Sequence, residues 1–394
     1  MSERGVTPPL VAFGFLSFFY FATIGLFNPY APLWFKELGF STIVIGLIAS
    51  LQSWTRVVAP YAWSWFGDHT GRHVQLIRIA AAASLVFAAA LLGARQVVWV
   101  ALATGLLFVA NSGVVPLSET AVANHLSRGS GIDAVRYGRM RMWGSVGFIL
   151  SVTLVGALLQ VAGMALFPVV LVLVYALLLW ASTRLPEARS HVAHDAPPPP
   201  VWPLLRRPEV AWFFASVFFV VLAHAGLYAF FSLYLVSLGY GKAAVGALWA
   251  VSVAAEIVYF WFHGRWTGHL APLRWLQVFA LVTAGPFAAT AGAGHWPAVL
   301  VLAQISHAIT FAAHHSTCIT LLHRYFPGRS RGRGQALYST LGYGLSGVLG
   351  GVCGGLIIDS LGFAAVFWAA SAAAVAGWWC AGKALHSPSS QVPG

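Results

Sequence analysis

Four charged side chains fall within long apolar segments of this 394-residue sequence. Arg56 and Glu256 lie near the middle of their segments, Glu119 lies in the inner half of its segment, and Arg141 lies just inside the start of another. A charge at the centre of an apolar, membrane-spanning helix costs about 2.5–3.5 kcal/mol on an insertion scale. Charges that are kept at such a cost bind ions or polar solutes, or they carry protons. The alternative is an ion pair that only locks two helices together.

Histidines add a second kind of chemistry to the same segments, because imidazole binds and releases a proton near neutral pH. Helical spacing puts two polar stripes on single faces. The first stripe consists of Gln304, His307, Phe311, His314 and Cys318, and the second of Trp249, Ser252, Glu256, Tyr259 and His263. Gln52 precedes Arg56 by one turn, and His224 lies in another apolar segment, whereas His315 falls off the first stripe and is interpreted as structural. Polar stripes with aromatic members on otherwise apolar helices indicate the lining of a central cavity.

The elements that must position these residues follow from composition. Apolar residues make up 59% of the chain and charged residues 8%, against about 25% charged in soluble domains. A soluble enzyme, a disordered scaffold and a secreted disulfide module are therefore excluded. Twelve apolar blocks of about 20 residues or more predict an all-α membrane protein with twelve transmembrane helices. The predicted helices begin near Leu10, Thr42, Gln75, Val97, Tyr137, Ala165, Pro208, Lys242, Ala271, Pro297, Gln335 and Leu361.

The basic residues are distributed unevenly between the two sides of these helices. With the N-terminus inside, the outer loops receive only Lys36, Arg95 and Lys242, and the inner loops receive eighteen Lys and Arg residues. This positive-inside bias predicts cytoplasmic N- and C-termini in a multi-pass protein of a bacterial-type inner (plasma) membrane. No soluble basic domain accounts for the net charge of +12, so nucleic acid is not expected as a partner. The three cysteines are isolated, and no spacing typical of metal ligands occurs, so we expect neither a metal nor a cofactor.

The sequence repeats itself at an offset of 200 residues. Leu38-Gly39-Phe40 matches Leu238-Gly239-Tyr240, and Gly46 matches Gly246. Residues 185–207 are polar, charged and rich in proline, which predicts a cytoplasmic linker. The sequence therefore predicts a six-helix N-terminal half (residues 1–184), the linker, and a six-helix C-terminal half (residues 208–394).

Between the second and third predicted helices the sequence reads Gly67-Asp68-His69-Thr70-Gly71-Arg72-His73. Together with the duplication, this loop resembles the inner-loop motif of the major facilitator superfamily, although His69 and His73 stand where that family has basic residues. The resemblance implies the major facilitator fold, with a solute site between the halves and alternating access. It also implies a gating role for Gly67, Asp68, Gly71 and Arg72.

A closer resemblance follows at Tyr137-Gly138-Arg139-Met140-Arg141-Met142-Trp143-Gly144, which is similar to the phenylpropionate permease and lactose permease branches. The resemblance implies that Glu119 and Arg141 contact solute and that Glu256 and His307 take the positions of a proton relay. Two positions depart from it. Thr310 replaces an acid of lactose permease, and residues 280–290 lack the arginine of the ninth helix.

We therefore expect a monomeric, proton-coupled symporter that imports a small organic solute across the lipid bilayer. The solute is predicted to be an aromatic carboxylate that resembles 3-phenylpropionate, because arginines suit the carboxylate and the aromatic-rich segment from Phe13 to Phe27 suits the ring. The predicted solute contacts are Arg56, Glu119, Arg141, Gln52, Trp143, His224 and Trp249. Glu256 is predicted to carry the proton, with His307 or His314 as its partner. A sugar or nucleoside symporter is the alternative, followed by a proton-driven exporter, and no motif of an enzyme is found.

Overall fold

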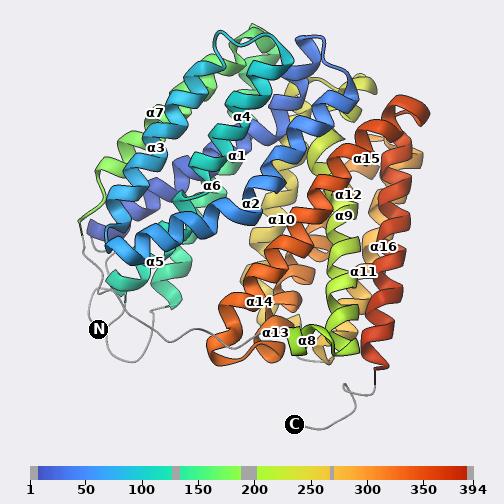
Figure 1. Ribbon diagram of the computed structural model, residues 1–394. Helices are drawn as coiled ribbons and strands as arrows, with labels where there is room; N and C mark the ends of the chain where they lie inside the picture. The colour runs from blue at the N-terminus through green and yellow to red at the C-terminus, as the bar shows by residue number, and fades with distance from the viewer. Residues whose placement is uncertain (1–7, 127–133, 188–201, 267–269, 388–394) are drawn as a thin grey trace. The chain divides into compact units, whose positions relative to one another are not determined.

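The computed structural model describes residues 8–126, 134–187, 202–266 and 270–387, and within these ranges it contains helices and no strand (Figure 1). Twelve helices in these ranges are long and apolar enough to cross a membrane, which confirms the predicted number. They begin at Leu10, Thr42, His73, Val97, Arg136, Met164, Pro208, Lys242, Pro272, Pro297, Arg331 and Phe363. The largest difference from the predicted starts is four residues, between Gln335 and Arg331. Helices satisfy every backbone hydrogen bond internally, which apolar surroundings require.

Contacts divide the chain into two compact units. The first comprises the described parts of Met1–Phe40, Thr55–Asp195 and Lys242–Ala247. The second comprises Ser41–Trp54 and the described parts of Ala196–Gly241 and Leu248–Gly394. Two helices, α2 (Thr42–Thr70) and α10 (Lys242–Trp266), contribute residues to both units.

The first unit is built on the pairing of α1 with α6. Its other helices are α3, α4, α5 and α7; the bounds are α1 (Pro8–Glu37), α3 (His73–Ala90), α4 (Val97–Asn111), α5 (Val114–Leu126), α6 (Ala134–Ala162) and α7 (Phe167–Thr183), with a 3₁₀ turn at Met164–Leu166. Close approach of α1 and α6 depends on glycine. A Cβ at Gly147 would collide with the Phe18 carbonyl, and one at Gly25 would lie 2.7 Å from the Phe148 carbonyl oxygen. The Ser151 hydroxyl donates to the Ala22 carbonyl at 2.8 Å across the same interface.

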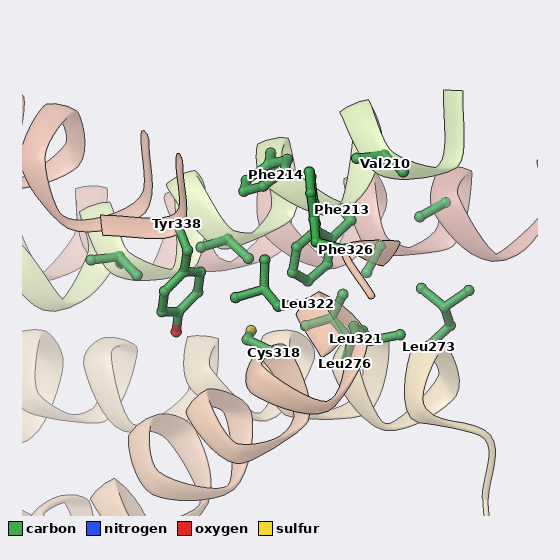
Figure 2. Close-up of a cluster of buried hydrophobic side chains, with 14 residues drawn as sticks. Val210, Phe213, Phe214, Leu273, Leu276, Cys318, Leu321, Leu322, Phe326 and Tyr338 are labelled. Atoms are coloured by element: carbon green, nitrogen blue, oxygen red, sulfur yellow. The ribbon is translucent and has the colours of Figure 1, made fainter. Parts of the chain in front are cut away.

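The second unit is organised around α9, α11 and α16. Its helices are α8 (Trp202–Leu205), α9 (Pro208–Ser237), α11 (Pro272–Ala293), α12 (Pro297–His307), α13 (His314–Tyr325), α14 (Arg331–Leu337), α15 (Ser346–Leu361) and α16 (Phe363–Leu385), with a 3₁₀ turn at Gly328–Ser330. Figure 2 shows the cluster of buried side chains that α9, α11, α13 and α16 help to form, and Phe213, Leu276 and Phe326 belong to it. Because Phe213, Leu276 and Phe326 are fully buried, this cluster fixes α13 against its neighbours.

Two spans of the second unit change their helical period. Residues Ala308–Ala313 and Tyr338–Leu345 are π-helical and join α12 to α13 and α14 to α15. Short π-helical segments inside α-helices occur frequently at functional sites. They matter here because a wider turn changes which side chains share a face.

The internal repeat is visible as a repeated turn. Gly39 and Gly239 both have a left-handed backbone, with φ of 84° and 89°. Their flanking hydrogen bonds correspond: the Phe40 amide donates to the Phe35 carbonyl at 3.1 Å, and the Tyr240 amide donates to the Leu235 carbonyl at 3.0 Å. Glycine ends both helices because it adopts this conformation without strain.

The predicted linker is described only at its ends, since residues 188–201 lie outside the described residues. At its beginning, Arg78 of α3 donates to the Glu187 carboxylate at 2.7 Å, the Leu185 carbonyl at 3.1 Å and the Ser182 carbonyl at 3.4 Å. Arg78 thereby caps carbonyls at and just beyond the C-terminal end of α7.

Candidate functional site

The first unit gathers charged and aromatic side chains around a small cavity between α1, α5 and α6. The cavity has a volume of about 30 Å³, and its lining includes Glu119, Tyr137 and Arg141 together with Tyr20 and Phe21. The Arg141 guanidinium carbon lies 4.5 Å from the centre of the Phe21 ring. The Tyr137 hydroxyl donates to Glu119 Oε1 at 3.5 Å. The fold therefore brings Glu119 and Arg141 to one cavity.

The two predicted partners are not an ion pair with each other. Among the described residues, neither Glu119 nor Arg141 forms an ion pair, and a ring rather than an acid faces Arg141. A guanidinium over an aromatic ring keeps its charge and its hydrogen-bond donors available. The arrangement can therefore accept an anion.

Arg56 adds a second cation to this part of the first unit. Its charge acts on the Tyr20 hydroxyl together with the charges of Arg141 and Glu119. Arg56 is exposed, and it too has no ion-pair partner within the ranges that the structure describes. Tyr20 therefore lies within electrostatic reach of two cations and one anion.

Gln52 and Trp143, the other solute contacts predicted on the N-terminal helices, do not line this cavity. Gln52 is half-buried on α2 and belongs to the second unit. Trp143 is exposed on α6, and its indole Cδ1 would lie 3.3 Å from a Cβ at Gly14 of α1. Conversely, Tyr20, Phe21 and Tyr137 are lining residues that the site prediction omitted. Tyr137 precedes Arg141 by four residues, so helical spacing could have identified it.

In the second unit, Glu256 of α10 faces His307 of α12. Glu256 Oε1 lies 3.2 Å from His307 Nε2, and the side chains are 20% and 7% exposed. His314, the other predicted partner of Glu256, is buried and lies beside Cys318, whose sulfur is 3.7 Å from His314 Nδ1. Geometry thus brings His307, and not His314, to Glu256.

His224, predicted as a solute contact, lies instead beside this acid–imidazole pair. Its ring centre is 5.4 Å from that of His307. Its Nδ1 lies 2.8 Å from the Val220 carbonyl oxygen, which only accepts, so Nδ1 carries a proton. Its Nε2 lies 3.3 Å from the hydroxyl of Thr310. Both nitrogens of this buried imidazole are therefore engaged.

Trp249 is connected to the same cluster through Tyr228 of α9. The Tyr228 and Trp249 rings stack with their centres 6.0 Å apart, and Tyr228 meets His307 edge-on at 6.2 Å. The indole nitrogen of Trp249 donates to the Ser232 hydroxyl at 3.3 Å. Trp249 is buried, so in this conformation it supports the cluster.

The predicted gating loop is a tight turn, in which the Gly71 amide donates to the Gly67 carbonyl at 2.8 Å. Gly71 has a φ of 64°, and a Cβ at Gly67 would lie 2.7 Å from the side chain of Leu117. Asp68 Oδ1 lies 3.3 Å from Nε2 of the buried His73. Arg72 is exposed and forms no ion pair within the described part of the chain.

This arrangement of twelve spanning helices in two units is that of a membrane transporter. Residues 10–369 match the MFS_1 like family, and the chain belongs to this family of the major facilitator superfamily. It is therefore a multi-pass membrane protein with the major facilitator fold, as predicted.

Two sequence relatives and one solved structure show how far the similarity extends. The chain is 29% identical over 359 residues to the probable 3-phenylpropionic acid transporter of Escherichia coli (strain K12), covering 89% of this chain and 91% of the relative. It is 26% identical over 368 residues to the maltose permease of Geobacillus stearothermophilus, covering 90% of this chain and 88% of that relative. The crystal structure of the nucleoside transporter NupG has a TM-score of 0.80 at 16% identity, over 96% of this chain and 99% of that chain, which shows the shared fold.

Proposed function

We propose that this protein is a proton-coupled symporter that imports a small aromatic carboxylate by alternating access. The observation that carries the proposal is the position of Arg141, which lies over the Phe21 ring instead of against Glu119. With Arg56 and Glu119 counted, the groups around Tyr20 carry two positive charges and one negative charge. A solute with one negative charge balances this cluster, whereas a neutral solute leaves it positive.

The size of the cavity defines which part of the solute it holds. A cavity needs about 10–15 Å³ by this measure to hold one water molecule, so a volume of about 30 Å³ admits a polar group of the size of a carboxylate and not a whole aromatic acid. A carboxylate suits it because the planar guanidinium offers two parallel donors to two oxygens. The aromatic ring of the solute would then lie outside this cavity. The name of the Escherichia coli relative, a probable 3-phenylpropionic acid transporter, supports the same class of solute.

Glu256 and His307 are our candidates for the proton-coupling pair. The Glu256 carboxylate and the His307 imidazole are 3.2 Å apart, so a proton can pass between them, and imidazole in general changes charge near neutral pH. Importing one proton with a monoanion moves no net charge. One unit of pH gradient, worth about 1.4 kcal/mol, would then support roughly tenfold accumulation.

The same proposal includes the architecture and orientation predicted above. Residues 1–184 and 208–394 form the two halves, residues 185–207 link them inside the cell, and both termini are cytoplasmic in an inner membrane. The repeated turns at Gly39 and Gly239 support a duplicated unit. The loop of Gly67, Asp68, Gly71 and Arg72 would act as part of the inner gate in a monomer.

The test is transport by the purified protein in vesicles with controlled pH and potential. We expect 3-phenylpropionate uptake, with alkalinisation of the medium, to follow an imposed pH gradient and to ignore a potassium-diffusion potential at equal pH. A sugar or a nucleoside carried with one proton would respond to both, because a charge then moves. Similarity to a maltose permease makes maltose the necessary comparison solute.

Glu256→Gln tests the coupling itself, because glutamine cannot release a proton. This variant should retain exchange of labelled for unlabelled solute and lose accumulation driven by a pH gradient. Glu37→Gln is the matched control, since Glu37 is exposed at the end of α1. If Glu256→Gln still accumulates solute at the wild-type level under a pH gradient, Glu256 does not carry the coupling proton. If the wild-type protein takes up maltose and no arylcarboxylate, the proposed class of solute is wrong.

A further inference from the structure

His315 has surroundings that set it apart from the other imidazoles of the second unit. Its Nδ1 lies 2.8 Å from the Tyr338 hydroxyl and 3.2 Å from the Tyr343 hydroxyl. The two hydroxyls are themselves 3.4 Å apart. The sequence stripe excluded His315, but its ring stacks on that of Phe311, with centres 6.1 Å apart and planes at 12°.

The π-helical segment Tyr338–Leu345 explains why two tyrosines converge on one nitrogen. Backbone hydrogen bonds of a π-helix join residues five apart, so Tyr338 and Tyr343 lie one above the other on the same face. In an α-helix, residues five apart point in different directions. Tyr338 is in addition held by the buried cluster of Figure 2, where its ring lies beside Cys318.

Tyrosine hydroxyls allow His315 to change its protonation state. A hydroxyl rotates, so it accepts from a protonated Nδ1 or donates to a bare one, and every form of the imidazole keeps a partner. His224 differs because both of its nitrogens are engaged and its side chain is 2% exposed. His315 is only partly buried.

His315 also lines a second cavity, which lies between α11 and α13. This cavity has a volume of about 400 Å³, and its lining consists of Pro272, Trp275, His315, Ser316, Thr317, Ile319 and Thr320. A cavity needs about 10–15 Å³ by this measure to hold one water molecule, so this one has room for several. An imidazole and three hydroxyls supply the polar partners that such water needs.

The position of His315 along its span indicates the direction in which a proton would move from His307. It follows His307 by eight residues, which is about two helical turns farther along the span. This displacement is toward the basic end of the second unit, where Arg324 and Arg331 lie and where the proposed orientation places the cytoplasm. The Glu256 charge acts on His315. The titratable groups that face His315 are thus Glu256, Tyr338 and Tyr343, with His314 adjacent in sequence.

We propose that His315 is the group through which the coupling proton leaves the Glu256–His307 pair for water in the cavity between α11 and α13. The proposal rests on the proton coupling proposed above. The Phe311 ring stacks between His307 and His315 and cannot carry a proton, so water carries it past the ring. The proton binds His315 at Nε2 to give an imidazolium and then passes to cavity water as hydronium, which restores the neutral imidazole.

His315→Gln is the first test, because glutamine retains polarity without titrating. We expect exchange of labelled solute within about twofold of wild type, and a fall of about tenfold or more in pH-driven uptake, the size of effect typical of a lost proton-transfer group. His323→Gln, an exposed imidazole on the same helix, is the matched control. Tyr343→Phe should shift the pH at which uptake is half-maximal while leaving exchange unchanged, because Tyr343 positions the imidazole and does not carry the proton.

Water in the cavity is tested separately by thiol labelling. In a background with Cys318, Cys353 and Cys380 changed to serine, Thr320→Cys should react with a charged, membrane-impermeant thiosulfonate applied to inside-out vesicles. Val278→Cys, which is exposed on α11 but does not line the cavity, should not react. Equal lack of labelling at both positions would overturn the proposal.

The outcomes separate this proposal from the function on which it rests. A wild-type protein without pH-driven uptake would refute both. A coupled wild type with unchanged uptake and pH profile in His315→Gln would refute the role of His315 alone. Quantified protein in the vesicles and retained exchange show that each variant is folded.

Discussion

Replacing Arg141 by lysine tests the central assumption of the proposed solute site, because it keeps the charge and removes the planar fork. Arginine can give a carboxylate two hydrogen bonds, and losing one charge-assisted bond costs about 1.5–3 kcal/mol. Loss of the stacking that holds the guanidinium on the Phe21 ring adds about 0.5–1 kcal/mol at an exposed site. The sum of about 2–4 kcal/mol predicts binding of 3-phenylpropionate that is about 30- to 1,000-fold weaker.

The assay is equilibrium binding to purified protein by titration calorimetry. Arg95→Lys is the matched control, because Arg95 donates only to the nearby Leu92 and Ala94 carbonyls within the described residues. Phe21→Leu keeps the guanidinium and removes only the stacking, so it should weaken binding by about two- to fivefold. Affinity of Arg141→Lys within about threefold of wild type would refute the reasoning, since the fork would then contribute less than a single weak hydrogen bond.

Three further predictions address packing and orientation. Gly147→Ala places a methyl group against a backbone carbonyl of α1, whereas the methyl group of Gly138→Ala meets open space. Gly147→Ala should therefore lower the melting temperature, because overpacking costs about 1–3 kcal/mol, and Gly138→Ala should leave it unchanged. Arg78→Gln removes the hydrogen bonds to carbonyls at the end of α7 and should destabilise the protein by about 1 kcal/mol. Thermal unfolding in detergent measures this loss, and an unchanged midpoint would show that these hydrogen bonds are not needed. A cysteine at Lys242 should be labelled from outside whole cells and one at Arg331 should not, and the reverse result would invert the proposed topology.

Much of the fold was predictable because its signal is local. A membrane-spanning helix needs about 20 consecutive apolar residues, and each of the twelve spans satisfies this requirement within its own sequence. The turn after the first helix of each half was visible as Leu38-Gly39 and Leu238-Gly239, because left-handed backbone favours glycine.

The candidate site was predictable only in part. Helical spacing alone placed His307 on a polar face. Glu256, the acid that His307 contacts, was a candidate because a charge within a membrane-spanning helix is costly. Neither spacing nor composition indicated that Arg141 would lie on Phe21, because that contact depends on how α1 and α6 pack. The same limit applies to His224, whose partner Thr310 lies 86 residues later in the sequence.

The sequence by itself determined the class of protein, the number of spans and the types of residue available for binding and proton chemistry. These properties follow from apolar length and from the cost of burying charge, which are carried by each segment alone. Only the tertiary structure decided which side chains meet. The stripe drawn through His314 left His315 out, whereas the His315 ring stacks on that of Phe311, one turn before it. Packing between helices then brought Tyr338 and Tyr343 to that imidazole, a result that no single segment encodes.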